Sequence, residues 1–204
     1  MSYLAQSKDG ILEIRWHGRG GQGAISSAQI LAEAAFYDGF KGVTAAPSFG
    51  AERRGAPVTA STRLSPKPVR VFSQIEHPDI VIVLDETLLN SADATAGLKG
   101  GGWLVINTPR ELGQLGINGD FSIATADANS AAQEAGLIVA GSALVNTAML
   151  GAFARATGII SLESIKAAIA GKFPPAEARR NFEAARLTYE RTMVTVHRGV
   201  HRDR

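Results

Sequence analysis

Short apolar segments alternate with longer, helix-forming segments over the first two thirds of the chain. The longer segments predict helices at Gln22–Tyr37, Glu86–Ala96 and Ala128–Ala135. The short segments are rich in β-branched and aromatic residues and predict strands at Leu12–Trp16, Gly42–Ala46, Val58–Leu64, Val69–Phe72, Ile80–Leu84, Trp103–Ile106 and Phe121–Ala124. Such alternation is typical of parallel βαβ units with right-handed crossovers. We therefore expect an α/β fold with a Rossmann-like, mostly parallel sheet and flanking helices.

The last third of the chain is expected to be helical, with helices at Ala143–Ala156, Leu162–Ala170 and Ala176–Val194. The first of these is apolar around most of its circumference, so it lies either deep in the core or under another subunit. The last carries one apolar stripe at helical spacing, formed by Ala178, Phe182, Ala185, Tyr189 and Met193.

Two segments refine the expected sheet. Ile80–Leu84 consists only of large aliphatic residues, which is typical of a central strand that is buried on both faces. The run Ser65-Pro66-Lys67-Pro68 cannot continue a strand and suits a hairpin turn. The segment from Val58 to Phe72 is therefore expected to form an antiparallel hairpin.

The composition fits one folded domain. The chain has 204 residues, of which 45% are hydrophobic and 20% are charged. We expect an N-terminal extension at 1–10, an α/β domain at 11–195 and a basic tail at 196–204. No apolar run is long enough to cross a membrane, and residues 1–10 contain no apolar signal segment. These features predict a cytoplasmic protein that does not bind membranes.

The net charge of +2 comes from the C-terminal tail. His197–Arg204 holds three arginines and one aspartate, which leaves 18 basic and 18 acidic residues in the rest of the chain. A neutral body argues against a nucleic-acid-binding surface. The tail is expected to fray, with docking onto a partner as the alternative. His197 and His201 have the spacing of metal ligands, but their place in this tail argues against a metal site.

The residue types limit the chemistry of the chain. It contains no cysteine, which excludes disulfides, thiolate nucleophiles and cysteine ligands for iron–sulfur clusters. Ser26, Ser27 and Ser48 have no histidine and acid at a recognisable spacing, so a hydrolase triad is not indicated. We expect no catalytic residue and no metal ligand in this chain.

A glycine cluster separates the first expected strand from the first expected helix. Gly18, Gly20 and Gly23 satisfy the pattern G-x-G-x-x-G, in which backbone N–H groups can approach a phosphate closely. The additional Gly21 and the amide of Gln22 suggest a loop that is pressed against a neighbour. The alternative is a tight turn that packs the helix on the strand.

Binding of a nicotinamide dinucleotide is disfavoured by the second expected strand. Such a fold needs an acidic residue at the end of that strand to hold the ribose hydroxyls. Here the strand ends in Thr44-Ala45-Ala46-Pro47, and the nearest acid, Asp38, lies at the end of the preceding helix.

A second candidate segment is Pro47–Pro57, which follows that strand and so is expected near the carboxyl edge of the parallel sheet, where α/β folds build their sites. The three consecutive charged residues Glu52, Arg53 and Arg54 are most simply explained as a solvated loop. The large apolar side chain of Phe49 argues for a binding role instead, in which the guanidinium groups pair with pyrophosphate or carboxylate oxygens. The candidate residues here are Ser48, Phe49, Glu52, Arg53 and Arg54.

Two further polar residues lie next to or within elements that are expected to be buried. Asp85 follows the expected strand Ile80–Leu84 and is interpreted as the N-cap of the next helix. Asn146 lies within the apolar helix and is interpreted as a hydrogen-bonded interface amide rather than a catalytic group.

The two glycine-containing segments together resemble the gamma subunit, or gamma domain, of the pyruvate:ferredoxin and related 2-oxoacid:acceptor oxidoreductases. The segments that carry this resemblance are His17–Ala24 and Pro47–Val58, followed by Pro78–Asp85 and Asn146–Ala152. The likeness extends from residue 11 to about residue 190. The Pro47–Val58 segment is the specific part, because the glycine loop alone is common to many folds.

The resemblance implies a role within a larger enzyme. The family decarboxylates a 2-oxoacid on thiamine diphosphate with magnesium, passes electrons through [4Fe–4S] clusters and usually releases an acyl-coenzyme A. These groups are expected on partner chains, namely thiamine-binding alpha and beta subunits and a ferredoxin-like delta subunit. The resemblance assigns this chain to coenzyme A binding or access, through Gly18, Gly20, Gly21, Gln22, Gly23, Ser48, Phe49, Glu52, Arg53 and Arg54.

Two other functions remain as alternatives at this point: a stand-alone α/β module that binds a nucleotide or coenzyme A, and an NAD-dependent dehydrogenase. The sequence leaves the 2-oxoacid open among pyruvate, 2-oxoglutarate, branched-chain and aryl substrates. It also leaves open the electron acceptor and the stoichiometry of the complex.

Overall fold

The computed structural model describes residues 10–47, 54–71, 73–139 and 141–197. Its centre is a seven-stranded sheet. In spatial order the strands are β2 (Gly42–Pro47), β3 (Pro57–Ser65), β1 (Leu12–Arg19), β4 (Ile80–Val83), β5 (Gly102–Asn107), β6 (Phe121–Ala126) and β9 (Met193–Thr195). All of these strands run in one direction except β3 and β9, so the expected α/β architecture is confirmed.

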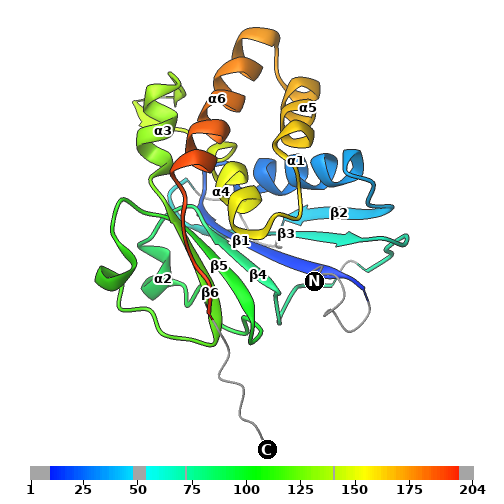
Figure 1. Ribbon diagram of the computed structural model, residues 1–204, viewed down its shortest axis with the longest axis vertical. Helices are drawn as coiled ribbons and strands as arrows, with labels where there is room; N and C mark the ends of the chain where they lie inside the picture. The colour runs from blue at the N-terminus through cyan, green and yellow to red at the C-terminus, as the bar shows by residue number, and fades with distance from the viewer. Residues whose placement is uncertain (1–9, 48–53, 72, 140, 198–204) are drawn as a thin grey trace, which may run out of the picture.

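The helices lie mainly on one face of the sheet, where they form a second layer (Figure 1). This layer contains α1 (Ala24–Tyr37), α3 (Ala128–Glu134), α4 (Ala148–Thr157), α5 (Leu162–Lys172) and α6 (Pro175–Arg191). On the opposite face, α2 (Leu88–Ser91) packs with Val81, Val83 and Leu104. A short 3₁₀ helix, η2 (Leu112–Gln114), follows β5. In the described part of the chain, no helix is long and apolar enough to cross a membrane.

The central strand β4 is buried on both faces, as its aliphatic sequence predicted. Ile80 and Ile82 belong to the core under the helices, whereas Val81 and Val83 belong to the smaller core on the opposite face.

The expected hairpin over Val58–Phe72 is wrong in its second strand. Strand β3 is antiparallel, but β1 and β2 already pair with its two edges, so no edge remains for residues 69–71, which form no strand.

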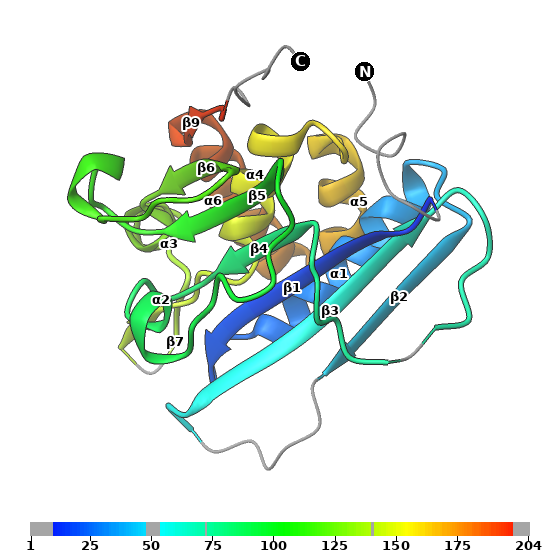
Figure 2. The same cartoon turned by 90° about the horizontal axis from the view of Figure 1, so that it is seen from below.

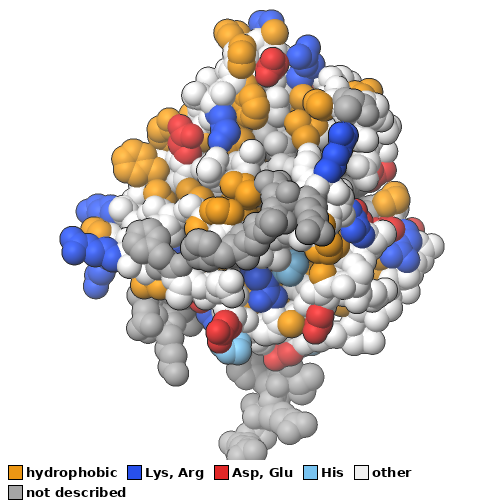
Figure 3. Space-filling model, turned by 180° about the vertical axis from the view of Figure 1, so that it is seen from behind, with side chains coloured by type: hydrophobic (Ala, Val, Ile, Leu, Met, Phe, Trp, Pro, Cys, Tyr) orange, Lys and Arg blue, Asp and Glu red, His pale blue; other side chains and the backbone are white. Residues whose placement is uncertain are grey.

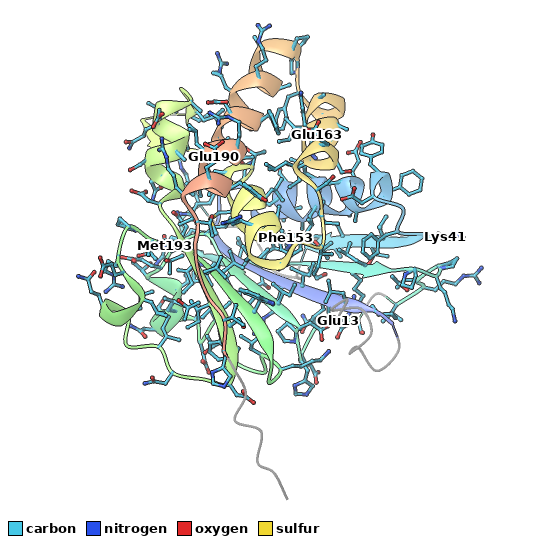
Figure 4. All side chains as sticks on the ribbon, in the orientation of Figure 1. Glu13, Lys41, Phe153, Glu163, Glu190 and Met193 are labelled. Atoms are coloured by element: carbon cyan, nitrogen blue, oxygen red, sulfur yellow. The ribbon has the colours of Figure 1, made fainter. Side chains whose placement is uncertain are left out.

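Helix α4 lies deep within the core of the chain itself. Phe153 and its neighbours are fully buried between α6 and the sheet (Figure 4). The contact with α6 is so close that a Cβ on Gly151 would lie 1.9 Å from the carbonyl oxygen of Ala185. The apolar circumference of α4 is thus explained without another subunit. The helix is also shorter than expected. It begins at Ala148, because Ala143 pairs in the hairpin of β7 (Ile138–Val139) and β8 (Ser142–Ala143) and residues 144–147 are not helical.

Two other predicted helices end differently. Helix α6 stops at Arg191, and the chain continues extended into β9, so Met193 is two-thirds exposed at the sheet edge and does not extend the apolar stripe. This position is visible in Figure 4. The segment Glu86–Ala96 contains only the single turn of α2, since Asp93 takes a left-handed conformation with φ of +42°.

Candidate functional site

The glycine loop joins β1 to α1, and a different constraint requires glycine at each position. Gly18 lies within β1, where a Cβ would be 3.2 Å from both Ala24 and Leu84. Gly21 and Gly23 have φ of +94° and +82°, a conformation that favours glycine. A Cβ on Gly21 would contact nothing within 4 Å, so only its backbone angle requires glycine. Helix α1 begins at Ala24 rather than Gln22 because Gly23 is left-handed.

The glycine loop is joined by backbone hydrogen bonds to the end of the second candidate segment. The Gly20 N–H donates to the Ala56 carbonyl at 2.8 Å, and the Gly55 N–H donates to the Gly20 carbonyl at 3.0 Å. These bonds form a parallel bridge between Gly20 and Arg54, whose side chain is exposed. The two sequence motifs therefore meet in one place. Ser48, Phe49, Glu52 and Arg53 lie outside the described residues.

Arg19 ties this junction to the end of β4. Its Nε donates to Asp85 at 2.9 Å, one terminal nitrogen donates to the Gly55 carbonyl at 3.1 Å, and the other donates to the Thr87 hydroxyl at 2.7 Å. The sequence interpretation missed Arg19, although it stands inside the glycine pattern. The Arg19 side chain thus links the glycine loop to two loops that are distant in the sequence, one at Gly55 and one at Asp85–Thr87.

Asp85 receives hydrogen bonds from both sides. One carboxylate oxygen accepts from Arg19 and Gln22, and the other accepts from the backbone N–H and hydroxyl of Thr87. Partial burial alone would raise the pKa of Asp85, but the bonds from Thr87 and Arg19 hold it below its ordinary value. Asp85 was expected to cap α2, yet the N-cap residue is Thr87, which Asp85 orients.

The Gln22 side chain folds back over the loop. Its oxygen accepts from the Arg19 backbone N–H at 2.7 Å, and its nitrogen donates to Asp85 at 3.3 Å. The described neighbours of this amide are therefore the loop itself and Asp85. Gln22 thereby stabilises the turn from within.

Asn146 lies beneath the start of α1. It is buried, its amide nitrogen would lie 2.9 Å from a Cβ on Gly23, and its backbone carbonyl accepts from the Ser27 hydroxyl. Its side-chain oxygen accepts from the Thr147 N–H. The expected role as an amide at an interface between subunits is not needed to explain these contacts, which are all within the chain.

The second candidate segment leaves β2 at the edge where β1 also ends. Strand β2 runs in the same direction as β1, but it pairs only with the antiparallel β3. The described ends of the segment, Pro47 and Arg54–Pro57, lie at the expected carboxyl edge, although β2 has no parallel neighbour. Asp38 lies at the C-cap of α1, where it accepts hydrogen bonds from Ser161 and Ser164 of α5. It therefore has a structural role away from the glycine loop.

The described part of this edge is suited to binding and positioning. Arg19 and Asp85 neutralise each other, and Arg54 presents an exposed guanidinium beside the backbone of the glycine loop. Seen from behind, the molecule shows basic and acidic side chains interspersed, with apolar side chains mainly over the upper half of the view (Figure 3). Such a surface fits contact with a protein or a mixed polar ligand better than it fits a polyanion.

Comparison with known proteins identifies the family of the chain. A family model described as "Pyruvate ferredoxin/flavodoxin oxidoreductase" matches residues 13–191. The chain is 48% identical over 187 residues to the pyruvate/ketoisovalerate oxidoreductases common subunit gamma of Thermococcus litoralis. The aligned region covers 90% of this chain and 98% of that protein. It is 50% identical over 179 residues to pyruvate synthase subunit PorC of Methanocaldococcus jannaschii, with 88% and 96% covered.

Solved structures agree with these relatives. The crystal structure of the pyruvate oxidoreductase subunit PORC from Thermotoga maritima matches with a TM-score of 0.77 and 39% identity, over 91% of this chain and 98% of that chain. A chain of the 2-oxoglutarate:ferredoxin oxidoreductase from Magnetococcus marinus shares the fold at 23% identity and a TM-score of 0.67. The match covers 88% of this chain but only 31% of that longer chain. The chain belongs to the pyruvate ferredoxin/flavodoxin oxidoreductase family, and its near full-length relatives are gamma-type subunits of such enzymes.

Proposed function

We propose that this chain is the gamma subunit of a 2-oxoacid:acceptor oxidoreductase that converts a 2-oxoacid to acyl-coenzyme A, and that it contributes to the binding or access of coenzyme A. The observation that carries the proposal is the junction of Gly20 with Arg54–Ala56, held by backbone bonds and by Arg19. It brings together the two segments that carry the family resemblance. Near full-length similarity to gamma subunits supports the same role.

The proposal assigns the redox chemistry to other chains. Because this chain has no cysteine, it offers no thiolate ligands for a [4Fe–4S] cluster. We assign thiamine diphosphate with magnesium to alpha and beta subunits and the clusters to a ferredoxin-like delta subunit. The complex is proposed to work in the cytoplasm.

Arg54 is the described residue best placed to contact coenzyme A. Its guanidinium is exposed, and a planar fork of N–H donors suits phosphate oxygens. The backbone of Gly20 is bridged to that of Arg54, and the space around Gly21 is open, since a Cβ there would contact nothing within 4 Å. By their place in the sequence, Ser48, Phe49, Glu52 and Arg53 are proposed to complete the site.

The test is kinetic and uses the assembled complex. Arg54→Ala should raise the KM for coenzyme A roughly ten- to a hundredfold, because a charge-assisted hydrogen bond contributes about 1.5–3 kcal/mol. Reduction of the clusters by the 2-oxoacid without coenzyme A should remain at the wild-type rate. The matched control is Arg179→Ala, which removes an exposed arginine from α6.

Two results would overturn the proposal. If reduction collapses while the KM for coenzyme A is unchanged, Arg54 serves the thiamine site instead. If the purified chain is active alone and forms no complex with the other subunits, the role as a gamma subunit is wrong.

A further inference from the structure

A pocket of about 460 Å³ opens on the face of β1, β3 and β2 that lies opposite the helical layer. Figure 2 shows this face from below, with the three strands in the foreground. His17, Ser61 and Ala46 form the floor, one from each strand, and the loops at 73–75 and 92–96 form the walls. The volume lies within the range of small-molecule sites. This pocket is distinct from the loop junction at Gly20.

His17 contributes a fixed hydrogen-bond donor to this pocket. Its Nε2 accepts from the Nε of Arg15 at 3.0 Å, so the proton of the neutral imidazole is on Nδ1. Burial and the nearby charge of Arg15 lower the pKa of His17 to about 4, which keeps the ring neutral at physiological pH. The side chain is only 5% exposed, and Nδ1 has no hydrogen-bond partner among the described residues. Every fully buried side-chain nitrogen or oxygen atom of the described residues has a hydrogen-bond partner. Because Nδ1 has none, it is not fully buried, and we infer that it faces the pocket that His17 lines.

Arg15 is occupied by the protein and is not available to an anion. Besides His17, it donates to the carbonyls of Ile75, Ala94 and Ala96 in the two wall loops and to that of the adjoining Glu76. Asp93 lies near enough to act on the charge of Arg15 and lines the same pocket. The two charges offset each other, so an ionic ligand group gains little here.

The remaining walls favour an uncharged ligand. Ala46, Pro47, Ile75 and Ala92 are apolar, and most of the lining surface comes from such groups. Against this background, the pocket offers an N–H donor from the buried His17 and a carboxylate acceptor from Asp93, with the smaller polar side chains of Thr59, Ser61 and Ser73 and the amide of Gln74 also in its lining. A ligand that satisfies both His17 and Asp93 carries a hydrogen-bond acceptor and a hydrogen-bond donor.

We propose that this pocket binds a neutral planar group that accepts a hydrogen bond from Nδ1 of His17 and donates one to Asp93. A secondary amide and the edge of a purine base share this chemistry. The inference goes beyond the proposed function and does not depend on it, because this chain alone contains every residue involved.

The experiment uses the full chain labelled with ¹⁵N and follows the imidazole nitrogens of His17 by long-range ¹H–¹⁵N correlation. Pantetheine is the probe for an amide, and adenosine is the probe for a purine. One of them should shift the Nδ1 resonance of His17 in a saturable manner. A response to pantetheine identifies the amide as the source, and a response to adenosine identifies the base.

Variants locate the binding. Ala46→Phe fills the pocket and should weaken the responding probe at least tenfold. Thr44→Phe is the matched control, because Thr44 lies on the same strand and face but outside the lining, and it should bind as the wild type does. Ala96→Leu at the rim is a second blocking variant in case Ala46→Phe does not fold. If neither probe shifts Nδ1, or if both blocking variants bind like the wild type, the inference is wrong.

Discussion

Strands β4 and β5 are covered by apolar side chains on both faces, whereas β1, β3 and β2 have an apolar layer on the helical face only. In β1, Leu12, Ile14 and Trp16 point to the helices, and the alternate residues Glu13, Arg15 and His17 point to the open face. The same sheet is thus stabilised by two means. One half depends on burial of aliphatic surface, and the other also depends on ion pairs and arginines that hold loop carbonyls.

The half of the sheet that is covered on both faces contributes stability, whereas the open half has space for a ligand. Where aliphatic side chains fill both faces, no space remains for a ligand. On the open half, the loops at 73–76 and 92–96 are held against the sheet by Arg15 and Arg63, and a pocket remains between them. The proposed coenzyme A edge at Gly20 borders the same half.

The largest expected effect is on the open half. Arg63 is 2% exposed, pairs with Glu13 at 2.9 Å and donates to the Ser73 carbonyl at 2.7 Å. Arg63→Leu leaves two groups without their donor, the Glu13 carboxylate and the Ser73 carbonyl, and since each such loss costs about 1–3 kcal/mol, we expect a loss of about 3–5 kcal/mol in the free energy of unfolding. Urea denaturation measures it. A loss below about 1 kcal/mol, the range of exposed ion pairs, would show that the open half does not depend on this pair.

The next effect concerns the pH dependence of stability. His17 has a folded pKa of about 4, below the ordinary value of 6.5, so the unfolded chain binds a proton more readily than the folded chain. Its contribution is complete above pH 6.5 and is lost as the pH falls toward 4. We expect about 2–4 kcal/mol of destabilisation over this window, from about 1.4 kcal/mol per pKa unit.

The control for this effect is His17→Gln, measured by urea denaturation at pH 7 and pH 4.5 beside the wild type. The difference between the two proteins should shrink at the lower pH. A constant difference would show that His17 does not titrate in this window.

A smaller effect is expected at the glycine loop. Gly23→Ala places a Cβ at 2.9 Å from the Asn146 amide nitrogen and requires φ of +82° from alanine. We expect a loss of about 1–3 kcal/mol of stability from this strain. Gly39→Ala is the matched control, because Gly39 also has a positive φ but open space around it. An equal loss in both variants would show that the contact with Asn146 adds nothing.

Local patterns in the sequence predicted those features that depend on neighbouring residues. Aliphatic density located β4, and the glycine cluster located the turn between β1 and α1, because conformation there follows from residue type. The resemblance predicted that the glycine loop and the Pro47–Val58 segment share one function. Their contact, however, could be recognised only in three dimensions.

Features that depend on distant residues were missed for the same reason. The antiparallel β3 has partners on both sides that lie up to about 50 positions away in the chain, which no local pattern records. Arg19 contacts Gly55, Asp85 and Thr87, and nothing near Arg19 in the sequence indicates these partners. The apolar helix α4 allowed two interpretations, and only the packing of α6 against it distinguished them.

The central claim is that the glycine loop and the Arg54 segment form one site, and a double-mutant cycle between Arg19 and Arg54 tests it most directly. Arg19→Lys keeps the charge beside Asp85 but cannot reach all three acceptors, so it should raise the KM for coenzyme A in the assembled complex. If Arg19 acts by positioning Arg54, the double variant with Arg54→Ala should have the same KM as Arg54→Ala alone. If the two effects multiply, or if Arg19→Lys leaves the KM unchanged, the two segments act separately and the claim is contradicted.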